Sequence, residues 1–185
     1  MLVEKCLIDY CAPTLASLKT ASLFCLTETA GLESLEQQVL VWNSQLREKG
    51  LFLTILCRRG EKVLVYVCRS SHLQADLQKP GVACFLAQYG YQSTELYDAL
   101  NRLAQRLEEE PYFPHEIGIF LGYPLGDVIG FIRNEGRNSK CTGSWKVYCN
   151  ECEALKMFAR FKKCREIYAR LWNQGRSIHQ LTVTA

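Results

Sequence analysis

Apolar and polar residues recur along this chain with two different periods, which predicts a mixture of helices and strands. From Leu32 to Lys49 apolar residues return mostly at three- and four-residue intervals, and Gly50 then breaks the pattern, which predicts a helix ending there. Two strand-like runs follow at Leu51–Cys57 and Lys62–Cys68. A short glycine-containing segment joins them, so we expect an antiparallel hairpin.

The other segments extend this alternation over the whole length. The pattern predicts strands at Ser22–Thr27 and Trp145–Cys149, a short helix at Pro13–Lys19, interrupted helices over Ser70–Glu110 and a long helix at Glu151–Asn173. No repeat, low-complexity tract or linker divides them. We therefore expect one α/β domain over residues 1–185, with a mixed sheet of about five strands that includes one antiparallel hairpin and is flanked by helices.

The segment from Pro114 to Pro124 is predicted to be a buried strand that ends at a Gly-Tyr-Pro turn. Pro124 suits the first position of a following helix, whose free N–H groups would face outward. Gly118 and Gly122 lack side chains, so a ligand or another backbone could approach closely. The spacing matches neither a P-loop nor a dinucleotide fingerprint. The pattern favours an anion site at this turn, with tight strand-to-helix packing as the alternative.

His115 and Glu116 are neighbours on that predicted strand, so their side chains should point to opposite faces. This geometry disfavours a catalytic dyad, and we assign no catalytic residue. One interpretation is structural, with His115 hydrogen-bonded to a neighbouring element and Glu116 paired with a basic residue. The other is that one of them reaches a ligand or transfers a proton, since histidine titrates in the useful range.

The net charge of +3 conceals an uneven distribution. Between Arg133 and Arg176 there are eleven Lys or Arg and four Asp or Glu, a balance of +7, which leaves −4 on the remainder. Several of these cations follow the Gly122 turn closely, which favours an anionic ligand there. The predicted ligand-binding residues are His115, Glu116, Gly122, Tyr123, Arg133, Lys140, Lys146 and Tyr148.

Composition and charge argue against a membrane protein and against nucleic acid as the partner. Hydrophobic residues make up 48% and charged residues 22% of the chain, as in globular proteins, and no apolar run approaches the roughly 18 residues of a membrane span. The first residues lack the features of an export signal, so we expect a cytoplasmic protein without membrane contact. Nucleic acid is not the expected partner, because the net charge is modest and no binding motif is present. Self-association into a homo-oligomer stays open.

Ten cysteines occur in the chain, and most are expected to be reduced core residues. Cys149 and Cys152 form a C-x-x-C pair at a predicted strand-to-helix junction, where a helix N-terminus would lower a thiol pKa. The alternative function is therefore a thiol- or iron-linked redox accessory protein. No second C-x-x-C or close His completes a zinc site, and Cys141 and Cys164 are no more than candidate extra ligands, so no cofactor is assigned.

Several motifs are distinctive, namely Cys11–Ala16, Pro114–Glu116, Leu121–Pro124, Asp127–Ile132, and Lys140 with Trp145–Tyr148. They resemble the motifs of an uncharacterised protein family from anaerobic Gram-positive bacteria and some of their phages. The resemblance covers most of the chain but implies no activity, because the family has no known function. The resemblance supports the presence of a site and, because the family extends to phages, suggests sequestration of a host metabolite or signal. The expected function is a non-enzymatic binding module for a small anionic or nucleotide-like ligand.

Overall fold

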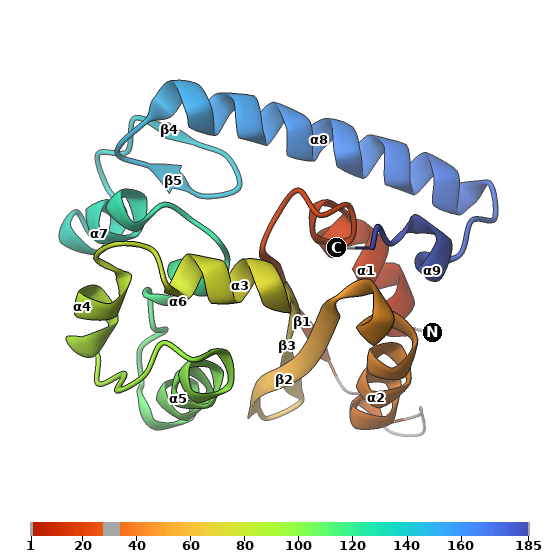
Figure 1. Ribbon diagram of the computed structural model, residues 1–185, viewed down its shortest axis with the longest axis horizontal. Helices are drawn as coiled ribbons and strands as arrows, with labels where there is room; N and C mark the ends of the chain where they lie inside the picture. The colour runs from red at the N-terminus through yellow and green to blue at the C-terminus, as the bar shows by residue number, and fades with distance from the viewer. Residues whose placement is uncertain (1, 28–33, 185) are drawn as a thin grey trace.

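The computed structural model describes residues 2–27 and 34–184, with a three-stranded antiparallel sheet at its centre (Figure 1). Its strands are β1 (Ala21–Thr27), β2 (Leu51–Arg59) and β3 (Lys62–Arg69), in the spatial order β1-β3-β2. The predicted hairpin is confirmed, because β2 and β3 pair antiparallel across a turn at Gly60.

The described helices lie before, between and after these strands. They are α1 (Leu2–Leu15), α2 (Leu35–Leu46), the 3-10 turn η1 (Arg47–Lys49), α3 (Ser70–Leu77), α4 (Val82–Ala87), α5 (Leu96–Glu109), α6 (Ile117–Phe120), α7 (Leu125–Arg133), α8 (Glu151–Asn173) and α9 (Ile178–Leu181). The helix predicted to end at Gly50, the breaks within Ser70–Glu110 and the long helix α8 are confirmed. The predicted start at Leu32 lies outside the described residues.

The mixture of helix and sheet is confirmed, but a single mixed sheet of about five strands is wrong. The remaining described strands, β4 (Cys141–Thr142) and β5 (Lys146–Val147), form a separate antiparallel pair. The strand predicted at Trp145–Cys149 is thus only two residues long. It does not join the central sheet, because β5 packs on α7 and Trp145 and Val147 form a small core with α8.

Each face of the central sheet carries its own apolar core, because successive side chains of a strand point to opposite faces. Tyr66 and Cys68 of β3 pack into a core with α3, α4, α5, α6 and α7. Val65 and Val67 pack into the other core, which α1, α2 and α9 cover. Figure 1 shows helices on both sides of the sheet. This double burial explains why β3 is apolar along most of its length.

The short helix predicted at Pro13–Lys19 is wrong, because α1 occupies Leu2–Leu15 and Pro13 lies in its last turn. Its buried positions Val3, Leu7, Cys11 and Leu15 recur every four residues, the spacing that places side chains on one face of a helix. A proline interior to a helix removes one hydrogen bond. Near the end of α1 that loss does not prevent the helix from forming.

The strand predicted within Pro114–Pro124 is also wrong, because Ile117–Phe120 forms α6. All four residues of α6 are buried, so the apolar run has no alternation that would distinguish a strand from a buried helix. Pro124 precedes α7 as its N-cap rather than as its first helical residue.

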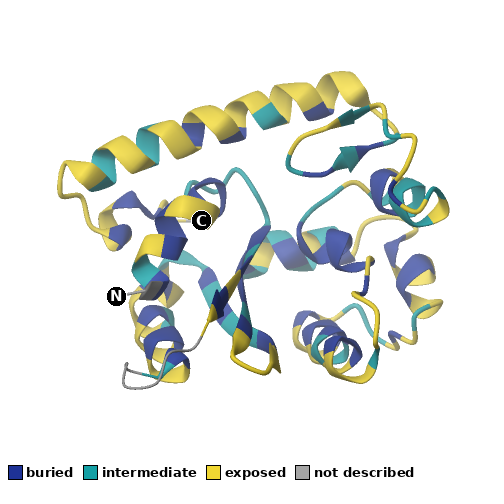
Figure 2. Ribbon diagram, turned by 180° about the vertical axis from the view of Figure 1, so that it is seen from behind, coloured by how far each residue is buried: buried dark blue, intermediate teal, exposed yellow. Residues whose placement is uncertain are grey.

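Helix α8 runs along the long axis of the molecule and packs on α1 and on the β4–β5 hairpin (Figure 1). Its buried residues are Ala154, Phe161 and Cys164, and most of its other side chains face solvent (Figure 2). No helix within the described ranges combines the length and the apolar character needed to cross a membrane.

Candidate functional site

A cavity of about 290 Å³ lies between the β4–β5 hairpin, α6, α7 and the residues just before α6. Its volume is close to the lower end of the ~300–1,000 Å³ typical of small-molecule sites, which are also concave and mainly apolar. The wall of this cavity is almost wholly apolar. The lining residues are Phe113, His115, Ile117, Gly118, Leu121, Tyr123, Asp127, Val128, Phe131, Thr142, Gly143, Trp145 and Lys146.

Aromatic rings form much of this wall. His115 packs edge-on against Phe131, with ring centres 5.0 Å apart, and Tyr123 stacks on Trp145 at 4.9 Å. Phe158 of α8 supports Trp145 from outside the cavity at 4.6 Å, with the two rings nearly perpendicular. Burial raises the pKa of Tyr123 to about 12, and its hydroxyl donates a hydrogen bond to a backbone carbonyl of the hairpin. These rings suit the face of a flat ligand.

Lys146 is the single Lys or Arg among the lining residues. Its Nζ donates to the carbonyl oxygen of Gly136 at 2.7 Å and lies 6.0 Å from the centre of the Phe131 ring. Because an ammonium group carries three donors, it can bind an anionic group without losing the Gly136 contact. The cavity therefore combines an apolar, aromatic body with one positive charge.

Asp127 also lines the cavity, but its carboxylate is fully engaged within the chain. Oδ1 accepts the backbone N–H groups of Tyr148 and Cys149, each at 2.8 Å, and Oδ2 accepts the indole N–H of Trp145 at 2.8 Å. Asp127 lies in the first turn of α7, where the helix dipole stabilises a negative charge. The Asp127 carboxylate thus supplies the negative charge that the N-terminal end of α7 favours. It also joins the β4–β5 hairpin to α7.

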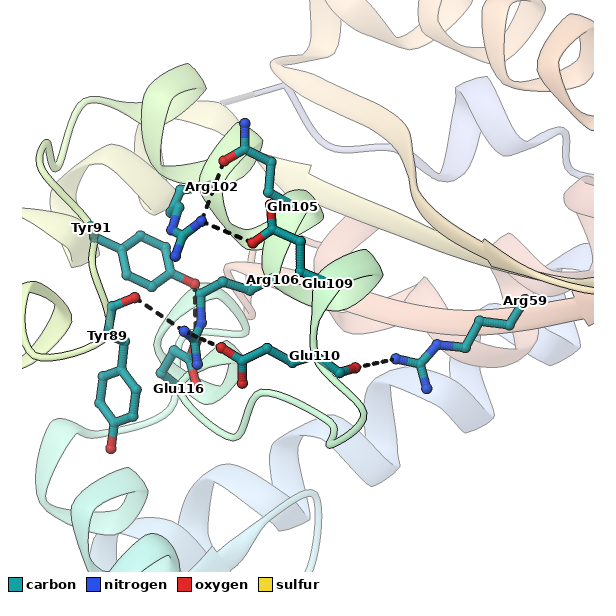
Figure 3. Close-up of polar contacts among 9 residues, drawn as sticks. All are labelled: Arg59, Tyr89, Tyr91, Arg102, Gln105, Arg106, Glu109, Glu110 and Glu116. Carbon is teal, nitrogen blue, oxygen red and sulfur yellow. Dashed lines mark hydrogen bonds and ion pairs between the residues drawn. The ribbon is translucent and has the colours of Figure 1, made fainter.

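His115 and Glu116 lie in the turn before α6 rather than on the predicted strand, and only His115 reaches the cavity. Glu116 is 1% exposed and its Oε1 accepts a hydrogen bond from Arg106 Nε at 2.5 Å (Figure 3). The Tyr91 hydroxyl donates to the same oxygen at 3.2 Å, and Arg106 also pairs with Glu110 at 2.5 Å. This buried group fixes the segment that carries His115 onto α5.

The Gly122 turn faces a different hollow of about 420 Å³, which shares Tyr123 with the cavity. Gly122 has φ of +77°, and a Cβ there would lie 2.6 Å from Thr20 Oγ1. Thr20 donates to Asp76 Oδ2 at 2.5 Å, and Asp76 pairs with Lys79. Thr20 and the carboxylate of Asp76 therefore lie against this turn, and the predicted cluster of cations does not.

Three other residues of the predicted set lie outside the cavity. Arg133 lines a groove between α4 and α7. Lys140 donates from Nζ to the carbonyl oxygen of Cys149 at 2.7 Å, and the Tyr148 hydroxyl donates to the carbonyl oxygen of Arg137 at 2.9 Å. The structure thus gathers His115, Tyr123 and Lys146 around one cavity and distributes the other five predicted residues around it.

Sequence reasoning missed four residues that shape the cavity, namely Phe113, Asp127, Phe131 and Trp145. Phe131 and Trp145 lie within the motifs that carried the family resemblance, but aromatic residues are most often part of a core. Asp127 carried a usable signal, because an acidic residue three positions after Pro124 suits the first turn of a helix.

Cys149 and Cys152 are both exposed and reduced. Partial desolvation and the Asp127 carboxylate raise the pKa of the Cys149 thiol, whereas a reactive cysteine needs a lowered pKa. In the part of the chain that the structure describes, no group of three or more His, Cys, Asp or Glu side chains is arranged to hold a metal ion.

Residues 7–182 match the family model described as a protein of unknown function (DUF3793). The chain belongs to that family. The expected membership of an uncharacterised family is therefore confirmed, and the matched region contains every residue that lines the cavity. Searches of curated proteins and of solved structures found no match.

Proposed function

We propose that this member of the DUF3793 family is a non-enzymatic, cytoplasmic binding module for a small anionic ligand of the nucleotide kind. The supporting observation is the cavity itself, where aromatic rings and the side chain of one lysine, Lys146, line the same apolar hollow. Binding without turnover would sequester the ligand.

In the proposed complex the ring of the ligand lies against the aromatic wall, where its burial supplies most of the binding energy. An anionic group of the ligand meets Lys146, whose Nζ already has one acceptor in Gly136 and keeps two donors for the ligand. A charge-assisted hydrogen bond of this kind is about twice as strong as a neutral one. His115, exposed at the cavity, can form a further contact.

Binding is favoured over catalysis because the carboxylate of the cavity, that of Asp127, is committed to structure. Asp127 accepts three hydrogen bonds from the chain, and Lys146 donates to a backbone carbonyl. A nucleophile paired with an oriented base is the usual mark of covalent catalysis, and the lining residues do not include such a pair. The raised pKa of Cys149 likewise opposes the thiol-based alternative.

Isothermal titration calorimetry with AMP, adenosine and ribose 5-phosphate tests this proposal. AMP should bind most tightly. Adenosine should bind more weakly because it lacks the phosphate that contacts Lys146, and ribose 5-phosphate should bind more weakly because it lacks the base that packs on the aromatic wall. Lys146→Met should weaken AMP binding about tenfold or more. Arg133→Met, which removes a cation from a neighbouring groove, is the matched control. Equal affinity for AMP in all three proteins would contradict the assignment.

A further inference from the structure

Helix α8 concentrates positive charge on the outside of the molecule. From residue 156 to residue 176 the sequence contains seven Lys or Arg and one carboxylate, Glu166. Six of these cations lie in α8 and Arg176 follows it, while Glu151 and Glu153 lie in its first turn. All seven cationic residues are exposed. Within residues 2–27 and 34–184, Lys156 pairs with Glu153, and no ion pair with a carboxylate is found for the other six. Those six are Arg160, Lys162, Lys163, Arg165, Arg170 and Arg176.

The cations cover both sides of the exposed face of α8. Lys156, Lys163 and Arg170 follow at seven-residue intervals, so they form a row with steps of about 10 Å along the helix. Arg160 and Lys162 lie on opposite sides of this row, about 60° and 100° from Lys163, because successive residues advance by about 100°. Arg165 lies about 200° from Lys163, near the buried side of α8 and close to Lys19. The 23 residues of α8 span about 34 Å, long enough to follow an extended polyanion.

The aromatic residues of α8 point inward, which decides between kinds of polyanion. Phe161 is buried, Phe158 packs on Trp145, and Tyr168 and Trp172 pack against the core under α1 and α2. Single-stranded nucleic acid is usually held by exposed aromatic rings on which its bases stack. The outer face of α8 has cations without such rings, which suits the phosphates of a duplex.

The outer face of α8 lacks the side chains that an acidic protein or an anionic membrane surface would need for binding. Protein interfaces depend on a few buried aromatic or Arg anchors in packed pockets, and helices that enter a membrane surface carry large apolar side chains on the lipid face. On the exposed surface of α8 the large apolar side chains are Leu155 and Met157, both close to its first turns. The row from Lys156 to Arg170 continues well beyond them.

We propose that α8 is a docking surface for the phosphate backbone of duplex nucleic acid, without sequence specificity. The charge of the remaining chain supports this orientation, because residues outside 133–176 sum to −4. Figure 1 places α8 along one edge of the molecule and α5 at the opposite edge, and the segment from Glu95 to Glu110 that contains α5 has five acidic and two basic side chains. This separation of charge favours the approach of a polyanion to α8 rather than to the edge that carries α5. The modest net charge, on which the sequence-based argument against nucleic acid rests, is the sum of this basic segment and an acidic remainder.

Fluorescence anisotropy with a labelled 24-base-pair DNA duplex of random sequence tests the proposal. The wild-type protein should bind at 50 mM NaCl and weaken steeply by 200 mM NaCl. Replacing three cations, Arg160→Gln, Lys163→Gln and Arg170→Gln together, should weaken binding at least tenfold at 50 mM NaCl. The slope of log affinity against log salt should fall by about 2 to 3, since each phosphate contact contributes about 0.9.

The matched control removes three exposed cations elsewhere, in Lys5→Gln, Arg47→Gln and Lys62→Gln together, with the same change in net charge. It should bind within twofold of the wild type, and both variants should melt like the wild type because only surface groups change. Absence of duplex binding at 50 mM NaCl, or equal loss in both variants, would overturn the proposal. So would tighter binding to the single strand or to phosphatidylserine vesicles than to the duplex.

Discussion

The indole N–H of Trp145 donates to Oδ2 of Asp127 at 2.8 Å, and so joins the β4–β5 hairpin to the first turn of α7. Asp127 is 3% exposed, and its other oxygen accepts the backbone N–H groups of Tyr148 and Cys149. One carboxylate therefore positions the ring that forms part of the cavity wall and closes the hairpin on that side.

Asp127→Asn should destabilise the protein by about 2 to 4 kcal/mol, because an amide cannot accept from all three donors and leaves a buried N–H without a partner. Urea unfolding followed by circular dichroism measures the change. Asp98→Asn is the matched control, since Asp98 is an exposed acid of α5, and it should change stability by less than about 0.5 kcal/mol. A similar small effect at both positions would mean that Asp127 does not hold the hairpin.

The buried pair of Arg106 and Glu116 should behave as a unit. Glu116→Leu should cost about 3 to 5 kcal/mol, because it leaves the Arg106 guanidinium buried without this carboxylate. The double variant Arg106→Met with Glu116→Leu should be more stable than Glu116→Leu alone, since it removes the buried guanidinium together with its buried carboxylate and leaves only the more exposed Glu110 without this partner. Urea unfolding of the four proteins gives the coupling energy. Additive losses would contradict a coupled pair.

Gly122→Ala tests the turn before α7. A side chain at φ of +77° is strained, and its Cβ would also lie 2.7 Å from Thr20 Cβ, so the combined loss should exceed about 3 kcal/mol. Gly60→Ala is the matched control, because Gly60 has φ of +60° but no atom within 4 Å of the added Cβ. It should lose only about 1 kcal/mol. Equal thermal unfolding shifts for the two variants would show that the contact with Thr20 imposes no cost.

Elements marked by a clear period, or by a turn between two apolar runs, could be predicted from the sequence, and a short element buried on all sides could not. The β2–β3 hairpin has a glycine turn between two apolar runs, and α8 repeats its apolar positions over 23 residues. By contrast, Ile117–Phe120 is buried throughout, so its apolar run fits a strand and a helix equally well. Pro13 predicts a helix start because proline is common there, and the neighbouring residues give no sign that α1 already began at Leu2.

The candidate site was predictable only in part, because its wall comes from three separate segments. His115, Tyr123 and Lys146 were predicted from residue type and position, and they meet at the cavity. Glu116 was assigned to the ligand as one alternative, whereas its partner Arg106 comes from α5 and is not identifiable from spacing. Phe131 reaches the cavity only because α7 packs beside the turn before α6.

Lys19 gives a prediction about pH. Its Nζ lies 5.4 Å from the centre of the Tyr123 ring, and burial, together with the nearby Arg165, lowers the pKa of Lys19 from 10.5 to about 8. Cys11 also faces it, but burial raises the pKa of that thiol, so it stays neutral near pH 8. Because the unfolded chain binds the Lys19 proton more tightly, the charged ammonium destabilises the folded state below about pH 8. This cost falls as the pH rises from 8 toward 10.5.

Lys19→Met should therefore raise the free energy of unfolding at pH 7 by on the order of 2 kcal/mol. The difference between the variant and the wild type should shrink at pH 9. Urea unfolding at pH 7, 8 and 9 measures it, and other titrating groups cancel because both proteins contain them. A difference that stays constant over this range would refute the lowered pKa.

The most direct measurement of the central claim uses Trp145 as a reporter in the cavity wall. The variant Trp42→Phe with Trp172→Phe keeps Trp145 as the single tryptophan of the chain. Titration with AMP should change the emission of Trp145 to saturation, with the dissociation constant found by calorimetry, and Lys146→Met in the same background should shift the midpoint to higher AMP concentration. Calorimetric binding of AMP that leaves the emission of Trp145 unchanged would contradict a ligand site in this cavity.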